Sequence, residues 1–170
     1  STPAIASAQV HLDGALVVIK SVIPYLLASL VSFSACAEKP SAANLPSVTV
    51  YKSPSCGCCV KWVEHMRKAG FEVTVNDVDN VHPVKMRVGV PPAKGSCHTS
   101  EVAGYFLEGH VPASDVKRLL AERPAAKGLA VPGMPMGSPG MEVPDGRTQA
   151  YDVELVAKDG TTSRFSRHGE

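Results

Sequence analysis

The apolar positions in the central part of the chain follow first a strand pattern and then a helix pattern. A β-branched run from Val48 to Tyr51 ends at Ser53-Pro54-Ser55, which predicts a strand that opens into a loop. The next apolar residues fall at i, i+3, i+4 and i+7, the spacing of one helix face, and charged residues occupy the opposite side. Gly70 predicts the end of this helix. The apolar face consists of Cys59, Trp62, Val63 and Met66.

The pattern continues with three further strand signals and two helix signals, and a segment without periodicity follows. Residues 71–75 alternate apolar with polar, as a strand would, and a short helix is predicted around 84–88, with Pro83 in its first turn. Strands are then predicted at 96–99 and 102–108, and Val116, Leu119 and Leu120 form the buried face of a last helix. Residues 128–145, rich in Gly, Pro and Met, should be irregular, and a hairpin is predicted from 151–157 and 161–165.

The predicted order is strand, helix, strand, helix, strand, strand, helix, with cysteines where the first helix begins. This order resembles the thioredoxin fold, so we expect an α/β, thioredoxin-like domain with an irregular Met/Gly/Pro-rich loop and a C-terminal β-hairpin. The domain should span residues 47–126, with residues 127–170 packed on it. The resemblance also implies a cis proline at Pro91, ahead of the third strand.

The N-terminal part has the features of a targeting segment. Lys20 precedes an apolar run from Val22 to Val31, which leads into small residues and is too short to span a bilayer comfortably. We interpret residues 1–36 as an export signal and residues 37–46 as a linker; the alternative is a buried or membrane-anchoring helix. Ser34-Ala35-Cys36 resembles the end of a lipoprotein signal. The expected location is the periplasm or cell envelope, with membrane contact only through the signal or a lipid anchor at Cys36.

Composition narrows the classes of partner. The chain has 170 residues, 44% of them apolar, which is enough for one domain with a substantial core. Lys and Arg number 17 against 16 Asp and Glu, so there is no basic field to hold a phosphate backbone. Nucleic acid is therefore not an expected partner.

The cysteines are clustered rather than spread along the chain. Assigning Cys36 to the signal leaves four of the five, and Cys56, Cys58 and Cys59 lie within four positions at the predicted helix N-terminus. Free N–H groups and the helix dipole favour thiolate there. A redox pair would need only Cys56 and Cys59, whereas a third sulfur suits a soft ion such as Cu(I). The cluster therefore predicts a metal site.

Several downstream residues could complete such a site. Cys97 lies in the predicted strand that follows the Pro91 loop, and this loop faces the start of the first helix in thioredoxin-like folds, although a strand cysteine can simply be packed in the core. Imidazole and thioether groups are also acceptable to copper. The further candidate ligands are His98, His110, Met134 and Met136, with Met141 nearby.

Taken together, five motifs resemble the CopG-type copper-resistance family of exported bacterial proteins. The resemblance implies a thioredoxin-like domain that holds several Cu(I) ions through bridging sulfurs of Cys56, Cys58, Cys59 and Cys97, with the histidines and methionines as outer contacts. It implies copper ions and envelope copper proteins, such as efflux systems, as partners, and it leaves open whether the protein is a copper oxidoreductase. The motifs are Cys56-Gly57-Cys58-Cys59, Val88-Gly89-Val90-Pro91-Pro92, Ser96-Cys97-His98-Thr99, Glu108-Gly109-His110-Val111-Pro112 and Gly133-Met134-Pro135-Met136-Gly137-Ser138-Pro139-Gly140-Met141-Glu142.

Two other functions are compatible with the cysteines. A periplasmic thiol-disulfide oxidoreductase would use Cys56 and Cys59 alone. A static zinc module would use all four, although zinc ligands usually arrive as separated pairs. Replacing Cys58 distinguishes the copper site from the redox enzyme, because only the former needs it.

Overall fold

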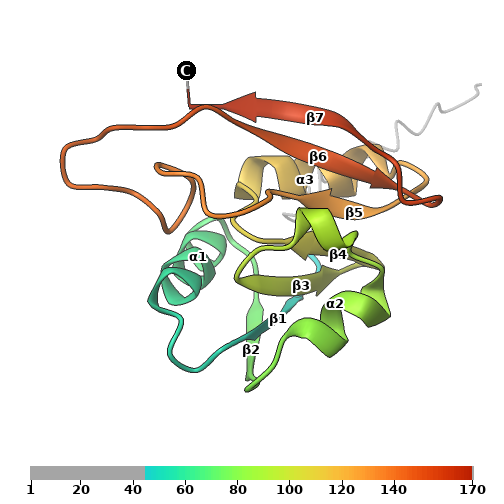
Figure 1. Cartoon of the computed structure of the whole chain (residues 1–170), viewed down its shortest axis with the longest axis horizontal. Coiled ribbons are helices and arrows are strands. Elements are labelled where there is room, and N and C mark those ends of the chain that lie inside the picture. Colours follow the sequence, from blue (N-terminus) through green and yellow to red (C-terminus); the bar gives the residue numbers. More distant parts are fainter. Residues whose placement is uncertain (1–44, 170) are drawn as a thin grey trace, which may run out of the picture. The chain divides into compact units, whose positions relative to one another are not determined.

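The computed structural model of the chain describes residues 45–169 (Figure 1). The predicted export signal at 1–36, its Cys36 and nearly all of the linker at 37–46 lie outside these residues. Within the described part, no helix is long and apolar enough to cross a membrane.

A seven-stranded mixed sheet organises the described residues, in the order β2-β1-β3-β4-β5-β6-β7 (Figure 1). The β1/β2 and β4/β5 pairs are parallel and the other neighbours are antiparallel. The strands are β1 (Val48–Lys52), β2 (Val73–Asp77), β3 (His98–Val102), β4 (Tyr105–Glu108), β5 (Ala126–Ala130), β6 (Tyr151–Ala157) and β7 (Thr162–His168). The helices are α1 (Gly57–Lys68), α2 (His82–Val88) and α3 (Ala113–Glu122), with a 3-10 turn η1 (Pro92–Lys94). From β1 to α3 the element order is the predicted one.

Helix α1 packs on the sheet through the face that its sequence predicts. Its buried residues are Cys59, Trp62, Val63 and Met66. Burying each large apolar side chain contributes roughly 1.5–3 kcal/mol, so this face anchors the helix. The indole Nε1–H of Trp62 donates to the carbonyl of Val111 at 2.9 Å. That bond ties α1 to the segment that follows β4, next to His110.

Strand β5 was not predicted, and the expectation of irregular structure from residue 128 is wrong for residues 128–130. Gly128 stands in the middle of β5, between β4 and β6. A Cβ at this position would collide with the backbone carbonyl of Phe106. The glycine therefore permits a close approach of two buried strands, whereas in the sequence it suggests a loop. Residues 131–150 contain no helix or strand, which agrees with the prediction of irregular structure as far as residue 145.

Three other local predictions need correction. Val102 belongs to β3, because the chain turns at Ala103 and Gly104, which have φ of 46° and 85°. Strand β2 begins at Val73 and leaves Phe71 in the core. The cis proline is wrong: residues 45–169 contain no cis peptide bond, and Pro91 begins the turn η1 instead of leading directly into β3.

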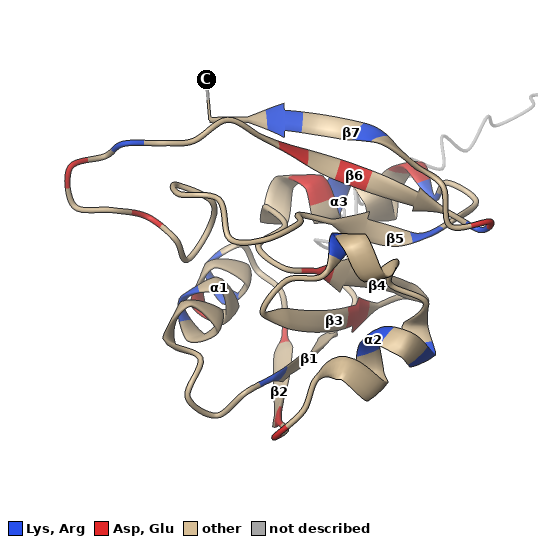
Figure 2. Ribbon diagram, viewed as in Figure 1, with Lys and Arg blue, Asp and Glu red and all other residues tan. Residues whose placement is uncertain are grey.

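The C-terminal hairpin was predicted, and it extends the sheet through β5/β6 pairing. Figure 2 shows charged residues along β6 and β7. On the edge strand β7, the Nε of Arg164 lies 3.1 Å and the Nη1 of Arg167 3.0 Å from the carboxylate oxygens of Asp152. Exposed pairs of this kind contribute little stability, but charges on an edge strand oppose pairing with another chain.

Candidate metal centre

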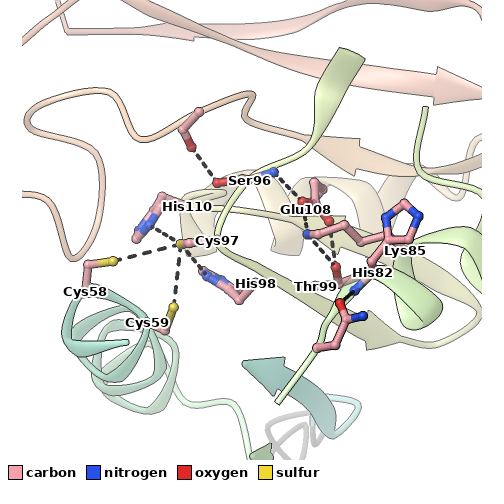
Figure 3. A network of polar contacts seen from close by, with 12 residues as sticks. Cys58, Cys59, His82, Lys85, Ser96, Cys97, His98, Thr99, Glu108 and His110 are labelled. Atoms are coloured by element: carbon pink, nitrogen blue, oxygen red, sulfur yellow. Dashed lines mark hydrogen bonds and ion pairs between the residues drawn. The ribbon is translucent and has the colours of Figure 1, made fainter. Parts of the chain in front are cut away.

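The four cysteines meet where β1 leaves the sheet and β3 enters it. Cys56 is the N-cap of α1, and Cys58 and Cys59 lie in its first turn. Strands β1 and β3 are antiparallel partners with Lys52 opposite His98, so the loop after β1 and the residue before β3 lie at the same end of the sheet. This pairing brings Cys97 to the N-terminus of α1 (Figure 3).

The sulfur atoms are close enough to share one ion or several. The Sγ of Cys97 lies 3.5 Å from that of Cys59 and 3.9 Å from that of Cys58. The Sγ atoms of Cys56 and Cys58 are 3.5 Å apart, and all four lie within 4.8 Å of one another. The expected convergence of Cys97 on the cysteine triplet is thus present in the structure.

Two of these cysteines are oxidised in the described form. A disulfide joins Cys56 to Cys59, while Cys58 and Cys97 are free thiols. Sulfur in a disulfide is a poor ligand compared with thiolate. A site of four thiolates therefore forms only after this disulfide is reduced.

His110 has a tautomer that its contacts define. Its Nδ1 lies 2.7 Å from the carbonyl oxygen of Pro139, and a carbonyl can only accept, so Nδ1 carries the proton. The unprotonated Nε2 then faces the Sγ of Cys97 at 3.1 Å. An imidazole held through one nitrogen, with the other nitrogen's lone pair facing a sulfur, has the arrangement of a metal ligand.

His98 approaches the same sulfur from the other side. Its Nδ1 lies 3.4 Å from the Sγ of Cys97, and its ring centroid lies 4.5 Å from that of Trp62. The side chain is fully buried, and its Nε2 has no hydrogen-bond partner among the described residues. Cys97, His98 and His110 therefore form a second candidate ligand group, which shares Cys97 with the sulfur cluster.

Burial controls the charge of this centre. It lowers the pKa of His98 well below the ordinary value and also lowers the pKa of His110, so both imidazoles are neutral at pH 7. Burial, together with the neighbouring Cys58, raises the pKa of the Cys97 thiol to about 12. Without metal, Cys97 thus keeps its proton, and a metal ion that binds there must displace it.

The segment from Gly137 to Met141 closes the centre on one side. Gly140 has φ of +88°, and a Cβ on it would lie 2.7 Å from the carbonyl oxygen of Cys58 and 2.9 Å from the amide nitrogen of Trp62. With the Pro139 carbonyl on His110, this segment packs against both halves of the site. The sequence reveals the composition of this segment, but its contribution is through backbone atoms, which carry no residue-specific signal.

The two predicted methionine ligands are more exposed to solvent than the buried histidines. Met134 is 52% exposed, and Met136 is half-buried, with its carbonyl accepting from the amide of Gln149 at 2.9 Å. Their role as copper ligands remains a prediction.

His65, beside the centre on α1, should make the apoprotein less stable in acid. Burial lowers the pKa of its imidazole, and its Nε2 accepts the amide N–H of Ala113 at 3.0 Å, which only the neutral ring can do. Below the unfolded-state pKa of about 6.5 the unfolded chain binds the extra proton first, so stability is lost as pH falls. Between pH 7 and 5, the free energy of unfolding measured in urea should fall less for His65→Gln than for the wild type, because the glutamine amide oxygen can still accept the Ala113 N–H. The same pH dependence in both proteins would contradict this role of His65.

Comparisons with known proteins agree with a copper-related site. A family model described as "Protein of unknown function, DUF411" matches residues 94–141, which include Cys97, His98 and His110. A solved structure described as copper resistance protein copG, Form 1, is 43% identical, with a TM-score of 0.70, and the match covers 74% of this chain and 99% of that chain. Its Form 2 is 44% identical, with a TM-score of 0.69, over 73% and 98%. A comparison with curated proteins gives no significant match.

Proposed function

Because the chain belongs to the CopG copper-resistance family, we propose that it binds copper in a cysteine-bridged site and serves copper resistance or homeostasis. The observation that carries the proposal is the meeting of four cysteine sulfurs within 4.8 Å. Thiolates are the ligands that Cu(I) prefers, and thiolates that bridge several ions spread their negative charge. We infer a multinuclear Cu(I) site with Cys56, Cys58, Cys59 and Cys97 as its ligands.

The histidines fit the same proposal. Cys97 belongs to both candidate groups, so a copper ion on its sulfur has the Nε2 lone pair of His110 beside it and His98 next to it. Both rings are held neutral by burial, as a ligand must be. Met134 and Met136 are proposed as exchangeable contacts through which copper enters or leaves.

A redox role for the centre is supported by the Cys56–Cys59 disulfide. Opening it takes two electrons and two protons, or two electrons alone if the thiolates bind metal. A dithiol reductant supplies both, and two Cu(I) ions that become Cu(II) supply the two electrons. We propose that the centre exchanges electrons with copper or with thiols in this way.

The thioredoxin-like fold is also part of the proposal. The strand order β2-β1-β3-β4, with the β1/β2 pair parallel and the β1/β3 and β3/β4 pairs antiparallel, supports it. So does the location of the cysteines at the start of the first helix. The added strands β5 to β7 and the loop between β5 and β6 enlarge that core.

The cell envelope is the proposed location. Support comes from the apolar run that precedes Cys36, which would act as an export signal and would permit a lipid anchor at that cysteine. Copper-efflux or other envelope copper proteins are the proposed partners.

Replacing Cys58 with serine tests the copper site directly. We expect Cu(I) affinity to fall about tenfold or more, because the Cys58 sulfur lies 3.5 Å from that of Cys56 and 3.9 Å from that of Cys97. The measurement is competition for Cu(I) with a chromophoric chelator under anaerobic, reducing conditions, combined with metal analysis and copper-edge X-ray absorption of the wild type. Zinc in the purified protein, or unchanged Cu(I) binding by Cys58→Ser, would contradict the proposal.

The disulfide also supports a second candidate function, thiol-disulfide exchange by Cys56 and Cys59. An enzyme of this class would reduce or oxidise protein disulfides without metal, and it would retain its turnover in Cys58→Ser. An insulin-reduction assay distinguishes the two functions. Turnover by metal-free protein at the rate of a true dithiol oxidoreductase would favour the second.

A further inference from the structure

A buried polar network lies beside the metal centre, on the side away from α1. The carboxylate of Glu108 is completely buried and accepts from Lys85 Nζ of α2 and from the Thr99 hydroxyl at 2.7 Å. It also accepts the backbone N–H of Ser96 at 2.5 Å. Figure 3 shows this network, which consists of Lys85, Ser96, Thr99 and Glu108, beside Cys58, Cys59 and Cys97.

The bond to Ser96 matters because Ser96 directly precedes Cys97. Residues 95–97 belong to no helix or strand, so their position depends on such contacts. The Ser96 hydroxyl donates to the carbonyl of Gly133, and the amide of Gly133 donates to the carbonyl of Gly95 at 3.3 Å. The segment is thus held by Glu108 on one side and by Gly133 on the other.

The chain immediately after Glu108 completes this arrangement. Gly109 has φ of +71°, and a Cβ there would lie 2.5 Å from the Ser96 hydroxyl oxygen. This turn lets Glu108 reach Ser96 while His110, two residues later, reaches the sulfur of Cys97. One tripeptide therefore contacts both members of the Ser96–Cys97 pair.

We propose that Glu108 is a positioning residue for Cys97: its hydrogen bond to the Ser96 amide sets where the Cys97 sulfur stands relative to Cys58, Cys59 and His110. Lys85 donates to the same carboxylate and holds it in place. That this positioning strengthens copper binding rests on the proposed function. The effect of Glu108 on the Cys97 sulfur itself can be measured in the apoprotein, without copper.

The test compares the double variant Lys85→Met/Glu108→Met with Glu108→Gln. Replacing a buried ion pair by apolar residues often leaves stability unchanged or higher, so the double variant should fold, but its Ser96 amide has no acceptor. Glutamine keeps a carbonyl oxygen for that amide. We expect Cu(I) affinity to fall about tenfold in the double variant, with fewer sulfur neighbours at the copper edge, and to remain close to wild type in Glu108→Gln.

A second measurement does not require copper. In the apoprotein, iodoacetamide should alkylate Cys97 faster in the double variant than in wild type or Glu108→Gln, as followed by peptide-resolved mass spectrometry. The matched control is Arg87→Met/Glu101→Met, which removes an exposed pair on α2 and β3 and should change neither readout. If the wild type binds no Cu(I) but Cys97 is alkylated faster in the double variant, the proposed function is rejected and the positioning role of Glu108 is retained.

A second pair of variants covers the case in which the double variant does not fold. Gly95 has φ of −63° and ψ of 146°, a conformation that suits a following proline. Ser96→Pro removes the amide donor, while Ser96→Ala removes the hydroxyl and keeps the donor. Ser96→Pro should bind copper more weakly than Ser96→Ala, and its Cys97 should be alkylated faster. Equal behaviour of these two variants, or wild-type affinity and alkylation in a folded double variant, would overturn the proposal.

Discussion

Replacing Cys97 with serine is expected to lower the affinity for Cu(I) by about 100-fold or more. Outer contacts of a metal site already contribute about 10- to 100-fold, and within residues 45–169 Cys97 is the one that belongs to both candidate ligand groups. Its sulfur lies within 4 Å of Cys58, Cys59 and both imidazoles. Serine keeps the size but offers a hard oxygen, which Cu(I) disfavours. The loss should therefore exceed that of Cys58→Ser.

The measurement is the same anaerobic chelator competition, with copper-edge X-ray absorption to count sulfur neighbours. Cys36→Ser provides the matched control, because the sequence predicts that this cysteine belongs to an export signal, and its loss should then leave copper binding unchanged. Thermal unfolding of both apoproteins checks that the fold is retained. If Cys97→Ser binds copper with wild-type affinity and stoichiometry, Cys97 is not a bridging ligand and the multinuclear site is contradicted.

Replacing Gly128 with alanine is expected to lower the free energy of unfolding by about 3 kcal/mol, although it adds a single methyl group. The added Cβ would meet the backbone carbonyl and ring of Phe106, and backbone cannot move aside as the end of a flexible side chain can. Because Phe106 and Gly128 are partners in the parallel β4/β5 pair, relief requires the strands to separate. Strand β5 joins the C-terminal hairpin to the rest of the sheet, so the damage should extend to β6 and β7.

Urea denaturation of the apoprotein measures this loss as a lower midpoint. Gly57→Ala provides the control, because a Cβ there has nothing within 4 Å and the residue begins α1. That variant should be neutral or slightly more stable, since alanine loses less backbone entropy than glycine on folding. A midpoint for Gly128→Ala equal to that of wild type would mean that β4 and β5 are not packed as described.

Packing between distant segments overrides the local signal at Gly128. This glycine suggests a loop, yet it lies in strand β5, where the absence of a side chain lets the backbone of Phe106 approach closely. The cis peptide at Pro91 was expected from the fold resemblance and not from a local pattern, and the turn η1 separates this proline from β3. No local pattern marks Glu108 as buried, and its acceptance of the Ser96 amide follows from β3/β4 pairing.

By itself, the sequence determined the apolar face of α1, the C-terminal hairpin and the kind of chemistry available at the site. These features are local: helix periodicity, turn residues and sulfur donors at a helix N-terminus are each contained in a few consecutive positions. Only the tertiary structure decided that Cys97 reaches the cysteine triplet, and that Pro139 orients the His110 ring. These contacts join residues far apart in the chain, and they depend on antiparallel β1/β3 pairing and on the packing of Gly140 against α1.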